Sequence, residues 1–281
     1  MAHPAPARKT FHALVLAAGQ GSRMGHLTSS LPKSCLPLTA DGSATFIRRI
    51  VDLSVRCGAE SIIVAVAFAW EQVRNELTDY SELVELIRVD LGTPTTGSLV
   101  TLSRAVQERP ALVAGSHHLL IQDADILYSA QSLNSFVHPA VPAGSRLLTY
   151  PASPDDAEEV IAYGDGTGVR TLGKALASGA TAGLTPLGES AGVCLIDKAD
   201  LSWVNNYLTT TDITRPHRDS QRNLDRTANP PSEWEELMRA LAADRELTAV
   251  RAPDALFVEV DTPADYIKAV QLYEHLADAS R

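Results

Sequence analysis

Three stretches of this sequence combine residue types that suit the binding of phosphate or metal. The first is LAAGQGSRMG at positions 16–25, which is followed by LPKSCLPL at 31–38. Its glycines let backbone N–H groups turn toward a ligand and approach it closely. Arg23 and Lys33 add two cations in or just after this loop. A glycine-rich turn with a fixed arginine and a fixed lysine has the chemistry of a polyphosphate cradle.

Two common glycine-rich signatures do not describe this loop. Its spacing is G-x-G-x-x-x-G, and we expect no helix to open at the third glycine, where a dinucleotide fingerprint requires one. The pattern G-x-x-x-x-G-K-[ST] is absent as well. A structural turn would account for the glycines alone but leaves Arg23, Pro32 and Lys33 unexplained. We therefore predict that the loop is functional.

The other two stretches end apolar runs with carboxylates. LLIQDADILYS at 119–129 carries Asp123 and Asp125, which alternation along an extended segment places on the same side. Ligands of open α/β sheets bind where parallel strands end. FVEVDTPADY at 257–266 carries Asp261 before a proline-started helix. Taken singly, each motif has a plain alternative, a solvated strand end for the first and a helix N-cap for the second.

Composition limits the class of protein. The chain has 281 residues, 45% of them hydrophobic, and a formal net charge of −10. This length and apolar content fit a single α/β unit with an insertion. The negative charge argues against nucleic acid or an anionic membrane as a partner. Three cysteines without metal or redox spacing, and no run of signal-peptide or membrane length, predict a cytoplasmic protein.

The elements that must position these motifs follow from apolar periodicity. Strand patterns at 12–17, 61–67, 118–122 and 146–150 alternate with helix patterns at 44–57, 72–77 and 98–106. This alternation predicts a doubly wound, mostly parallel sheet.

The second half of the chain follows a different pattern. It is expected to contain a β-hairpin around Gly164-Asp165-Gly166, a buried strand in PLGESAGVCLID and a helix at about 198–208. After a polar surface loop or lid at 209–232, we expect a helix in WEELMRALAA, a strand in FVEVD and a closing helix in PADYIKAVQLYEHLA. Residues 1–10 are predicted to be a flexible tail, and 11–281 a single domain.

In their order and spacing, the three motifs resemble the cytidylyltransferase branch of the sugar-phosphate nucleotidyltransferases. This branch includes phosphocholine, inositol-1-phosphate and phosphonate cytidylyltransferases, and the resemblance runs from about residue 12 to 276. It implies a Rossmann-like, GT-A-like nucleotidyltransferase fold with a mixed sheet. It also implies Mg²⁺ as cofactor, and CTP and a small phosphorylated or phosphonate acceptor as substrates. The chain departs from the pattern at Leu31, where relatives usually carry arginine, and at 67–70, where they often carry Gly-Tyr.

The resemblance also implies roles for individual residues. Asp125 and Asp261 would hold Mg²⁺, Lys174 would reach the phosphate of the acceptor, and Glu189 would lie near the acceptor. Lys33, Arg23 and Lys174 would be the catalytic cations. The implied nucleotide-binding residues are Leu16, Ala17, Ala18, Gly19, Gly21, Ser22, Arg23, Lys33, Thr96, Gly97, Ser98 and Asp123.

Elementary chemistry agrees with this assignment. A phosphate-ester acceptor is largely dianionic at neutral pH, since its second pKa is about 6, so it needs no general base. It needs relief from repulsion by the triphosphate and in-line positioning, which Mg²⁺, Arg and Lys provide. Together with the resemblance, this predicts transfer of CMP from CTP with release of pyrophosphate.

Several alternatives stay open at this point. They are a sugar-1-phosphate nucleotidyltransferase that uses another NTP, a metal-dependent glycosyltransferase and a non-catalytic nucleotide-sensing subunit. The glycosyltransferase would use Asp123 and Asp125 but leaves Arg23 and Lys33 without a role. Whether the protein forms a homodimer is also left open.

Overall fold

The computed structural model describes residues 10–91, 97–138, 143–152, 159–213 and 233–278 of the chain. Within these ranges, none of the helices is both long and apolar enough to cross a membrane. None of the three cysteines, all of which are described, forms a disulfide.

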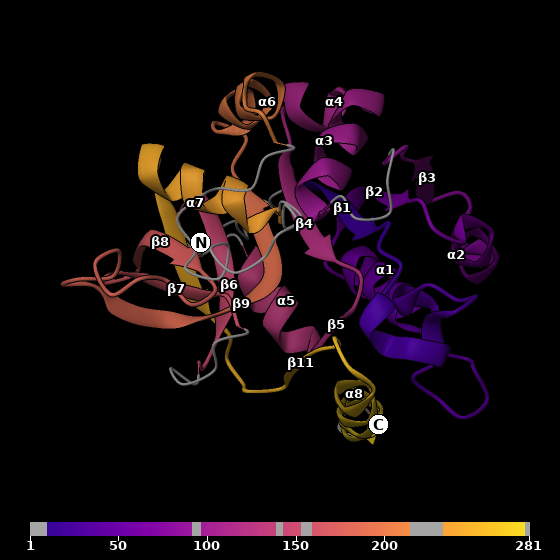
Figure 1. Ribbon diagram of the computed structural model, residues 1–281. Helices are drawn as coiled ribbons and strands as arrows, with labels where there is room; N and C mark the ends of the chain where they lie inside the picture. The colour runs from indigo at the N-terminus through magenta and orange to yellow at the C-terminus, as the bar shows by residue number, and fades with distance from the viewer. Residues whose placement is uncertain (1–9, 92–96, 139–142, 153–158, 214–232, 279–281) are drawn as a thin grey trace, which may run out of the picture.

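A nine-stranded mixed sheet forms the centre of the molecule (Figure 1). Its strands, in sheet order, are β3 (Val84–Arg88), β2 (Ala59–Val66), β1 (Phe11–Ala17), β4 (His118–Asp123), β9 (Thr185–Ile196), β6 (Ser145–Tyr150), β10 (Leu247–Arg251), β8 (Gly168–Gly173) and β7 (Ile161–Asp165). The pairings place seven of these described strands in one direction, with β8 and β9 opposed. The predicted mostly parallel α/β sheet is thus confirmed.

Helices cover both faces of this sheet because successive strand residues point to opposite sides. In β1, Leu14 and Leu16 pack into one apolar cluster, while Ala13 and Val15 pack into another. The first cluster includes residues from α3 (Ser98–Glu108), α4 (Ala111–Ala114), α6 (Leu201–Thr210) and α7 (Glu235–Asp244). The second includes residues from α1 (Phe46–Arg56), α2 (Trp70–Glu76) and α5 (Ala130–Val137). The sheet is therefore doubly wound, as the sequence predicts.

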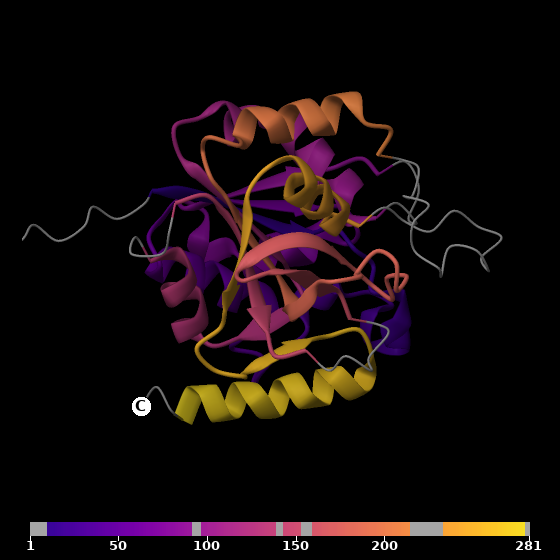
Figure 2. The ribbon, with the colours of Figure 1, turned by 90° about the vertical axis from the view of Figure 1, so that its left-hand side faces the viewer.

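A two-stranded sheet just after β4 joins the middle of the chain to its C-terminal part. It pairs β5 (Ile126–Tyr128) with β11 (Phe257–Glu259) in antiparallel fashion. The last helix, α8 (Pro263–Asp278), runs along the lower edge of the molecule next to β11 (Figure 2). It shares a third apolar cluster with Met24, which lies in the glycine-rich loop, and with Leu38, which follows Lys33. This packing brings the C-terminal motif to the N-terminal one.

The predicted hairpin is confirmed, with its turn at residues 166–167 rather than around Gly164-Asp165-Gly166. Glycine is required at 164, because a Cβ there would lie 1.9 Å from the carbonyl oxygen of Gly168.

Other boundaries also differ from the sequence expectation. The helix expected at about 198–208 begins at Leu201 and continues to Thr210, so the predicted loop cannot begin at 209. Residues 214–232 of that loop and 1–9 of the predicted tail lie outside the described residues. The sequence missed β3, β5, β10, α4 and α5, all of which are short elements.

Candidate active site

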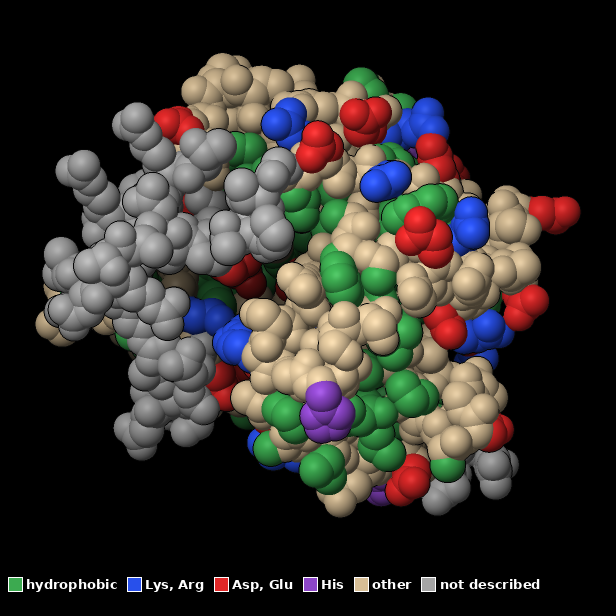
Figure 3. Space-filling view, turned by 45° about the vertical axis from the view of Figure 1, so that its right-hand side comes forward, with side chains coloured by type: hydrophobic (Ala, Val, Ile, Leu, Met, Phe, Trp, Pro, Cys, Tyr) green, Lys and Arg blue, Asp and Glu red, His purple; other side chains and the backbone are tan. Residues whose placement is uncertain are grey.

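A cavity of about 420 Å³ opens where β1 and β4 end, at the carboxyl edge of the parallel strands. In the space-filling view, acidic and basic side chains border a recess of the surface (Figure 3). The cavity is lined by Leu16, Ala17, Ala18, Gly19, Gly21, Ser22, Arg23, Lys33, Ser34, Leu91, Gly97, Ser98, Thr101, Asp123, Ala124, Asp125, Lys174, Glu233, Glu235, Glu259 and Asp261. Residues from both ends of the chain therefore share one site.

The glycine-rich loop is shaped around Lys33. Gly21 has a φ of +66°, and a Cβ at this position would lie 2.7 Å from Cγ of Lys33. The Thr28 hydroxyl donates to the Gly21 carbonyl oxygen at 2.7 Å and holds the turn. The chain between them forms 3-10 turns over Ser22–Thr28 that are interrupted at Gly25, whose φ is +60°. Gly21 is thus needed both for its backbone conformation and for the passage of the lysine side chain.

Asp125 and Asp261 are brought together by the register between β5 and β11. Glu259 pairs with Ile126, and the Val260 N–H donates to the Asp125 carbonyl oxygen at 3.1 Å. This register places two carboxylates that are far apart in the sequence beside each other. Asp125 itself lies in the turn after β4 rather than on an extended segment with Asp123, which corrects the sequence expectation.

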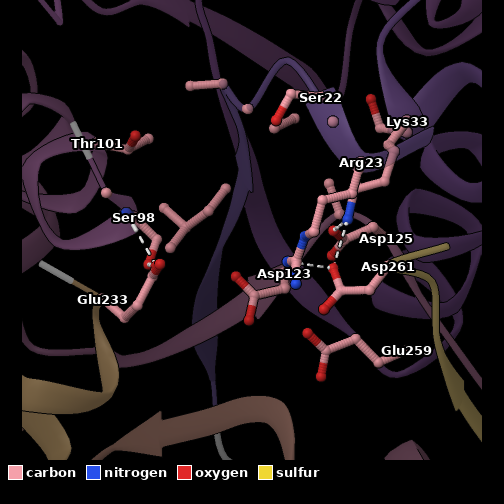
Figure 4. A pocket seen from close by; sticks show the side chains of 18 of the residues that line it. Ser22, Arg23, Lys33, Ser98, Thr101, Asp123, Asp125, Glu233, Glu259 and Asp261 are labelled. Atoms are coloured by element: carbon pink, nitrogen blue, oxygen red, sulfur yellow. Dashed lines mark hydrogen bonds and ion pairs between the residues drawn. The ribbon is translucent and has the colours of Figure 1, made fainter. Parts of the chain in front are cut away.

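Lys33 joins these two carboxylates (Figure 4). Its ammonium contacts a carboxylate oxygen of Asp125, lies 3.2 Å from Oδ1 of Asp261 and donates to the Val260 carbonyl oxygen at 2.6 Å. Arg23 donates to the same Oδ1 of Asp261 at 2.7 Å. Burial by itself would lower the pKa of Lys33, but the two aspartates raise it above its ordinary value. The lysine therefore stays charged at physiological pH.

Each of the two carboxylates keeps its second oxygen available. In the described part of the chain, neither Asp125 Oδ1 nor Asp261 Oδ2 accepts a hydrogen bond. The side chains are 24% exposed and both line the cavity. Two carboxylate oxygens beside solvent are ligands that suit Mg²⁺, which usually retains several waters. The described residues contain no ready-made cluster of three or more metal-ligating side chains.

Acidic residues outnumber basic ones in the cavity lining, six to three. Burial, together with Asp125 and Asp261, raises the pKa of Glu259 to about 7. Burial and Glu233 raise the pKa of Glu235 to about 8. A site that disfavours its own carboxylate charges in this way attracts cations.

Lys174 is the third cation of the lining and lies just after β8. Its charge lowers the pKa values of Glu235 and Glu259, which places it near both carboxylates. Lys33 and Arg23, by contrast, engage Asp261 directly. The cavity is therefore lined by two basic side chains at the glycine-rich loop and by a third one near the glutamates.

Asp123 and Ser98 are held by two neighbouring residues that directly precede α7. The Trp234 indole N–H donates to Asp123 Oδ2 at 2.9 Å. The Ser98 hydroxyl donates to Glu233 Oε2 at 2.7 Å and accepts from the Trp234 backbone N–H at 2.9 Å. Burial, then Glu235 and Asp125, raise the pKa of Asp123 well above its ordinary value, and the Trp234 hydrogen bond opposes that shift.

The structure gathers most of the residues that the sequence singled out. Of the predicted site residues, only Thr96 and Glu189 are absent from the lining; Thr96 lies outside the described residues. Glu189 lies in β9 opposite Tyr150 and Ile161, so the structure does not bring it to the cavity.

The sequence reasoning missed several residues of the lining. Glu259 carried a signal, because it stands two residues before Asp261 in the same motif. Glu233 and Glu235 carried none, because acidic residues are common in the first turn of a helix. The other missed residues are Ser34, Leu91, Thr101 and Ala124.

A family model, the MobA-like NTP transferase domain, matches residues 13–189. The chain belongs to the MobA-like NTP transferase family. The matched range includes the glycine-rich loop, Lys33 and the Asp123–Asp125 turn. At the level of the family, this confirms the expectation of an enzyme of the nucleotidyltransferase type.

Among curated proteins, the chain is 32% identical over 139 residues to the bifunctional protein GlmU of Bifidobacterium longum (strain NCC 2705). This match covers 49% of the chain and only 28% of that relative.

Solved structures share the fold over almost the whole chain. The inositol-1-phosphate CTP transferase from T. maritima superposes with a TM-score of 0.69 at 16% identity, covering 94% of this chain and 95% of that one. The CTP:phosphocholine cytidylyltransferase LicC from Streptococcus pneumoniae superposes with a TM-score of 0.66 at 16% identity, covering 94% and 99%. A UDP-glucose pyrophosphorylase complexed with UDP-glucose gives 0.66 at 13% identity, covering 95% and 98%. At these identities the likeness concerns the fold.

Proposed function

We propose that the protein is a Mg²⁺-dependent cytidylyltransferase that transfers CMP from CTP to the phosphate or phosphonate group of a small acceptor. The observation that carries this proposal is the meeting of Asp125, Asp261 and Lys33 beside the glycine-rich loop. Family membership supplies the reaction class, which is transfer of a nucleotidyl group.

Mg²⁺ fits the donor set of this site. Asp125 and Asp261 come from segments that follow different strands, converge on one ammonium and each present a second oxygen near solvent. Bound there with the nucleotide, Mg²⁺ would neutralise charge on the α-phosphate and orient it for attack. The excess of carboxylates in the lining supports the same conclusion, because it favours a divalent cation over an anion alone.

The basic side chains of this site would have separate roles in the reaction. An acceptor oxygen would form a bond to the α-phosphorus while the bond from that phosphorus to the bridging oxygen of pyrophosphate breaks. Lys33 and Arg23 would balance charge on the triphosphate, and Lys174 would hold the incoming phosphate or phosphonate group. No proton transfer to a general base is needed, because the acceptor is already ionised at neutral pH.

Glycine at 19 is consistent with close approach of the nucleotide. Apart from its two sequence neighbours, a Cβ at Gly19 would meet no atom of the described residues within 4 Å, and the φ of Gly19 is not in the left-handed region. Neither packing nor backbone conformation therefore demands glycine here. A nucleotide that lies against the loop backbone would demand glycine at this position, because a side chain there would occupy the same space.

CTP is proposed over other nucleotides because the small residues Gly97 and Ser98 line the cavity at the start of α3 and leave room for a pyrimidine there. The fold likeness to two CTP-dependent enzymes agrees with this choice. The second candidate is a sugar-1-phosphate nucleotidyltransferase that uses another NTP, favoured by the similar fold of the UDP-glucose pyrophosphorylase.

A pyrophosphate-release screen tests the proposal. The four NTPs would each be combined with phosphocholine, aminoethyl- and hydroxyethylphosphonate, inositol-1-phosphate and hexose-1-phosphates in the presence of Mg²⁺. We expect release with CTP and at least one phosphate or phosphonate acceptor. Release only with UTP or a purine triphosphate and a hexose-1-phosphate would favour the second candidate, and no release with any pair would refute both.

Lys174→Ala tests the assignment of the third cation. We expect a higher acceptor KM and a lower kcat/KM, with CTP binding in the absence of acceptor nearly unchanged, because one point charge cannot hold both the leaving pyrophosphate and the nucleophile in an in-line reaction. Calorimetric titration of CTP with Mg²⁺ measures this. If CTP affinity collapses in Lys174→Ala, the lysine belongs to the nucleotide site.

A further inference from the structure

Two adjacent residues, Glu233 and Trp234, contact two predicted nucleotide-binding residues from different elements. Glu233 accepts a hydrogen bond from the Ser98 hydroxyl at 2.7 Å, and the Trp234 indole donates to Asp123 Oδ2 at 2.9 Å. Figure 4 shows Ser98 and Glu233 together on one wall of the cavity, with Asp123 across from them. The pair thus connects the start of α3 with the end of β4.

Asp123 is confined on two sides. Trp234 engages Oδ2, and a Cβ on Gly192, which has a φ of +64°, would lie 2.7 Å from the same oxygen. The carboxylate therefore rests against the backbone of β9 at a position where no larger residue fits. Oδ1 accepts no hydrogen bond from the described part of the chain, and the residue lines the cavity. This arrangement leaves Oδ1 as the oxygen available to a ligand.

Trp234 is itself firmly placed. Its side chain is fully buried in the apolar cluster beneath α3, α6 and α7. Its backbone N–H donates to the Ser98 hydroxyl, and its carbonyl oxygen accepts from Leu237 in α7. Burial in the core explains the choice of an aromatic ring, but it does not explain an indole N–H directed at a carboxylate of the cavity.

We propose that Glu233 and Trp234 form a clamp that positions Ser98 and Asp123 for the nucleotide. Trp234 fixes the rotamer of Asp123 by occupying Oδ2, and Glu233 fixes the Ser98 hydroxyl at the N-terminus of α3. Neither residue needs to touch the reacting phosphorus, so both are positioning residues. The proposal rests on the proposed function, because it concerns the same nucleotide site.

The decisive test is a double-mutant cycle between Trp234→Phe and Asp123→Asn. Phenylalanine keeps most of the buried ring and removes the N–H donor. We expect Trp234→Phe to weaken binding of CTP with Mg²⁺ about 10-fold, the size of a lost hydrogen bond to a charged group. If the tryptophan acts through Asp123, the double variant binds CTP no more weakly than Asp123→Asn alone.

Trp203→Phe is the matched control. Trp203 lies in α6, stacks on Tyr207 with ring centroids 5.4 Å apart and does not line the cavity. We expect this variant to bind CTP as the wild type does. Thermal unfolding without nucleotide would be measured for every variant, since a merely structural role of Trp234 would lower the unfolding temperature and leave CTP affinity unchanged.

Glu233 provides a second test that does not depend on the core, because its side chain is exposed. Glu233→Ala should raise the KM for CTP several-fold with kcat nearly unchanged. Glu233→Gln should restore most of the loss, since its amide oxygen still accepts from Ser98. If Trp234→Phe does not fold, this pair decides the proposal.

These experiments distinguish failure of the clamp from failure of the proposed function. If the wild type binds CTP and releases pyrophosphate, and Trp234→Phe does both equally well, the clamp is refuted while the proposed function stands. Additive effects of Trp234→Phe and Asp123→Asn would also refute it. If the wild type binds none of the four NTPs, the proposed function fails and the clamp fails with it.

Discussion

Lys33→Met replaces the ammonium that joins Asp125 and Asp261 with an uncharged side chain of similar length. The lysine side chain is only 14% exposed, and the change leaves two carboxylates facing each other beside an unpaired Val260 carbonyl oxygen. Removing one partner of a buried ion pair costs about 3–5 kcal/mol. Because water reaches both carboxylates, which are 24% exposed, we expect a smaller loss of unfolding free energy, about 2 kcal/mol.

This loss is large enough to measure. With an unfolding entropy of about 2.1 cal/mol/K per residue, a chain of 281 residues should unfold about 3 °C lower in Lys33→Met than in the wild type when EDTA is present. Added Mg²⁺ should narrow the difference, because the two carboxylates then have a cation again. A ligand present at about 100 times its Kd adds about 2.7 kcal/mol to the free energy of unfolding, which is comparable with the loss expected for Lys33→Met.

Activity should not recover along with stability. The triphosphate still lacks its lysine, so kcat/KM should remain at least about 100-fold below the wild-type value at saturating Mg²⁺. Lys268→Met serves as the control, because this lysine is 66% exposed and, within the described part of the chain, forms its ion pair with Asp265 on the surface of α8. Its unfolding free energy should change by less than about 0.5 kcal/mol.

Two results would contradict the reasoning. If Lys33→Met unfolds at the wild-type temperature in EDTA, the ammonium does not hold the carboxylates together. If Mg²⁺ leaves the difference between variant and wild type unchanged, Asp125 and Asp261 do not form a metal site.

The same site supports further predictions. Asp125→Asn and Asp261→Asn should each reduce kcat by at least about 100-fold. The double variant should have a kcat only slightly lower than either single variant, because both carboxylates bind one metal ion. Near-normal turnover of either single variant would exclude that residue as a metal ligand. Gly21→Ala should destabilise the fold by about 1–3 kcal/mol, whereas Gly19→Ala should leave thermal unfolding unchanged and weaken CTP binding in calorimetry. Glu235 has a pKa of about 8 in the folded chain against an ordinary value of 4.5. The folded state thus binds an extra proton between these values, so unfolding free energy should fall as pH rises through that window. Denaturant titrations should show a shallower pH slope for Glu235→Gln, and an unchanged slope would contradict this assignment.

The sequence was sufficient to predict the sheet class, the long helices and most of the residues that line the cavity from the first half of the chain. These inferences depend on local properties. Apolar periodicity reports which face of an element is buried, and Gly21, Arg23 and Lys33 lie close enough together that one loop must contain them. The short strands β3, β5 and β10 were missed because a few residues carry too little periodicity to separate a strand from a loop.

What only the tertiary structure decided is which distant residues meet, and with which atoms. The resemblance assigned Asp125 and Asp261 to one metal. Their proximity, however, depends on the register of β5 against β11, and the side-chain pattern of neither segment specifies that register. Glu189 was expected near the acceptor, yet the pairing of β9 with β6 and β7 keeps it out of the cavity lining. The hydrogen bond from Trp234 to Asp123 had no local signal, because a tryptophan near the start of a helix indicates a core residue. Residue types predict the chemistry that is available, whereas strand register and packing decide where that chemistry is assembled.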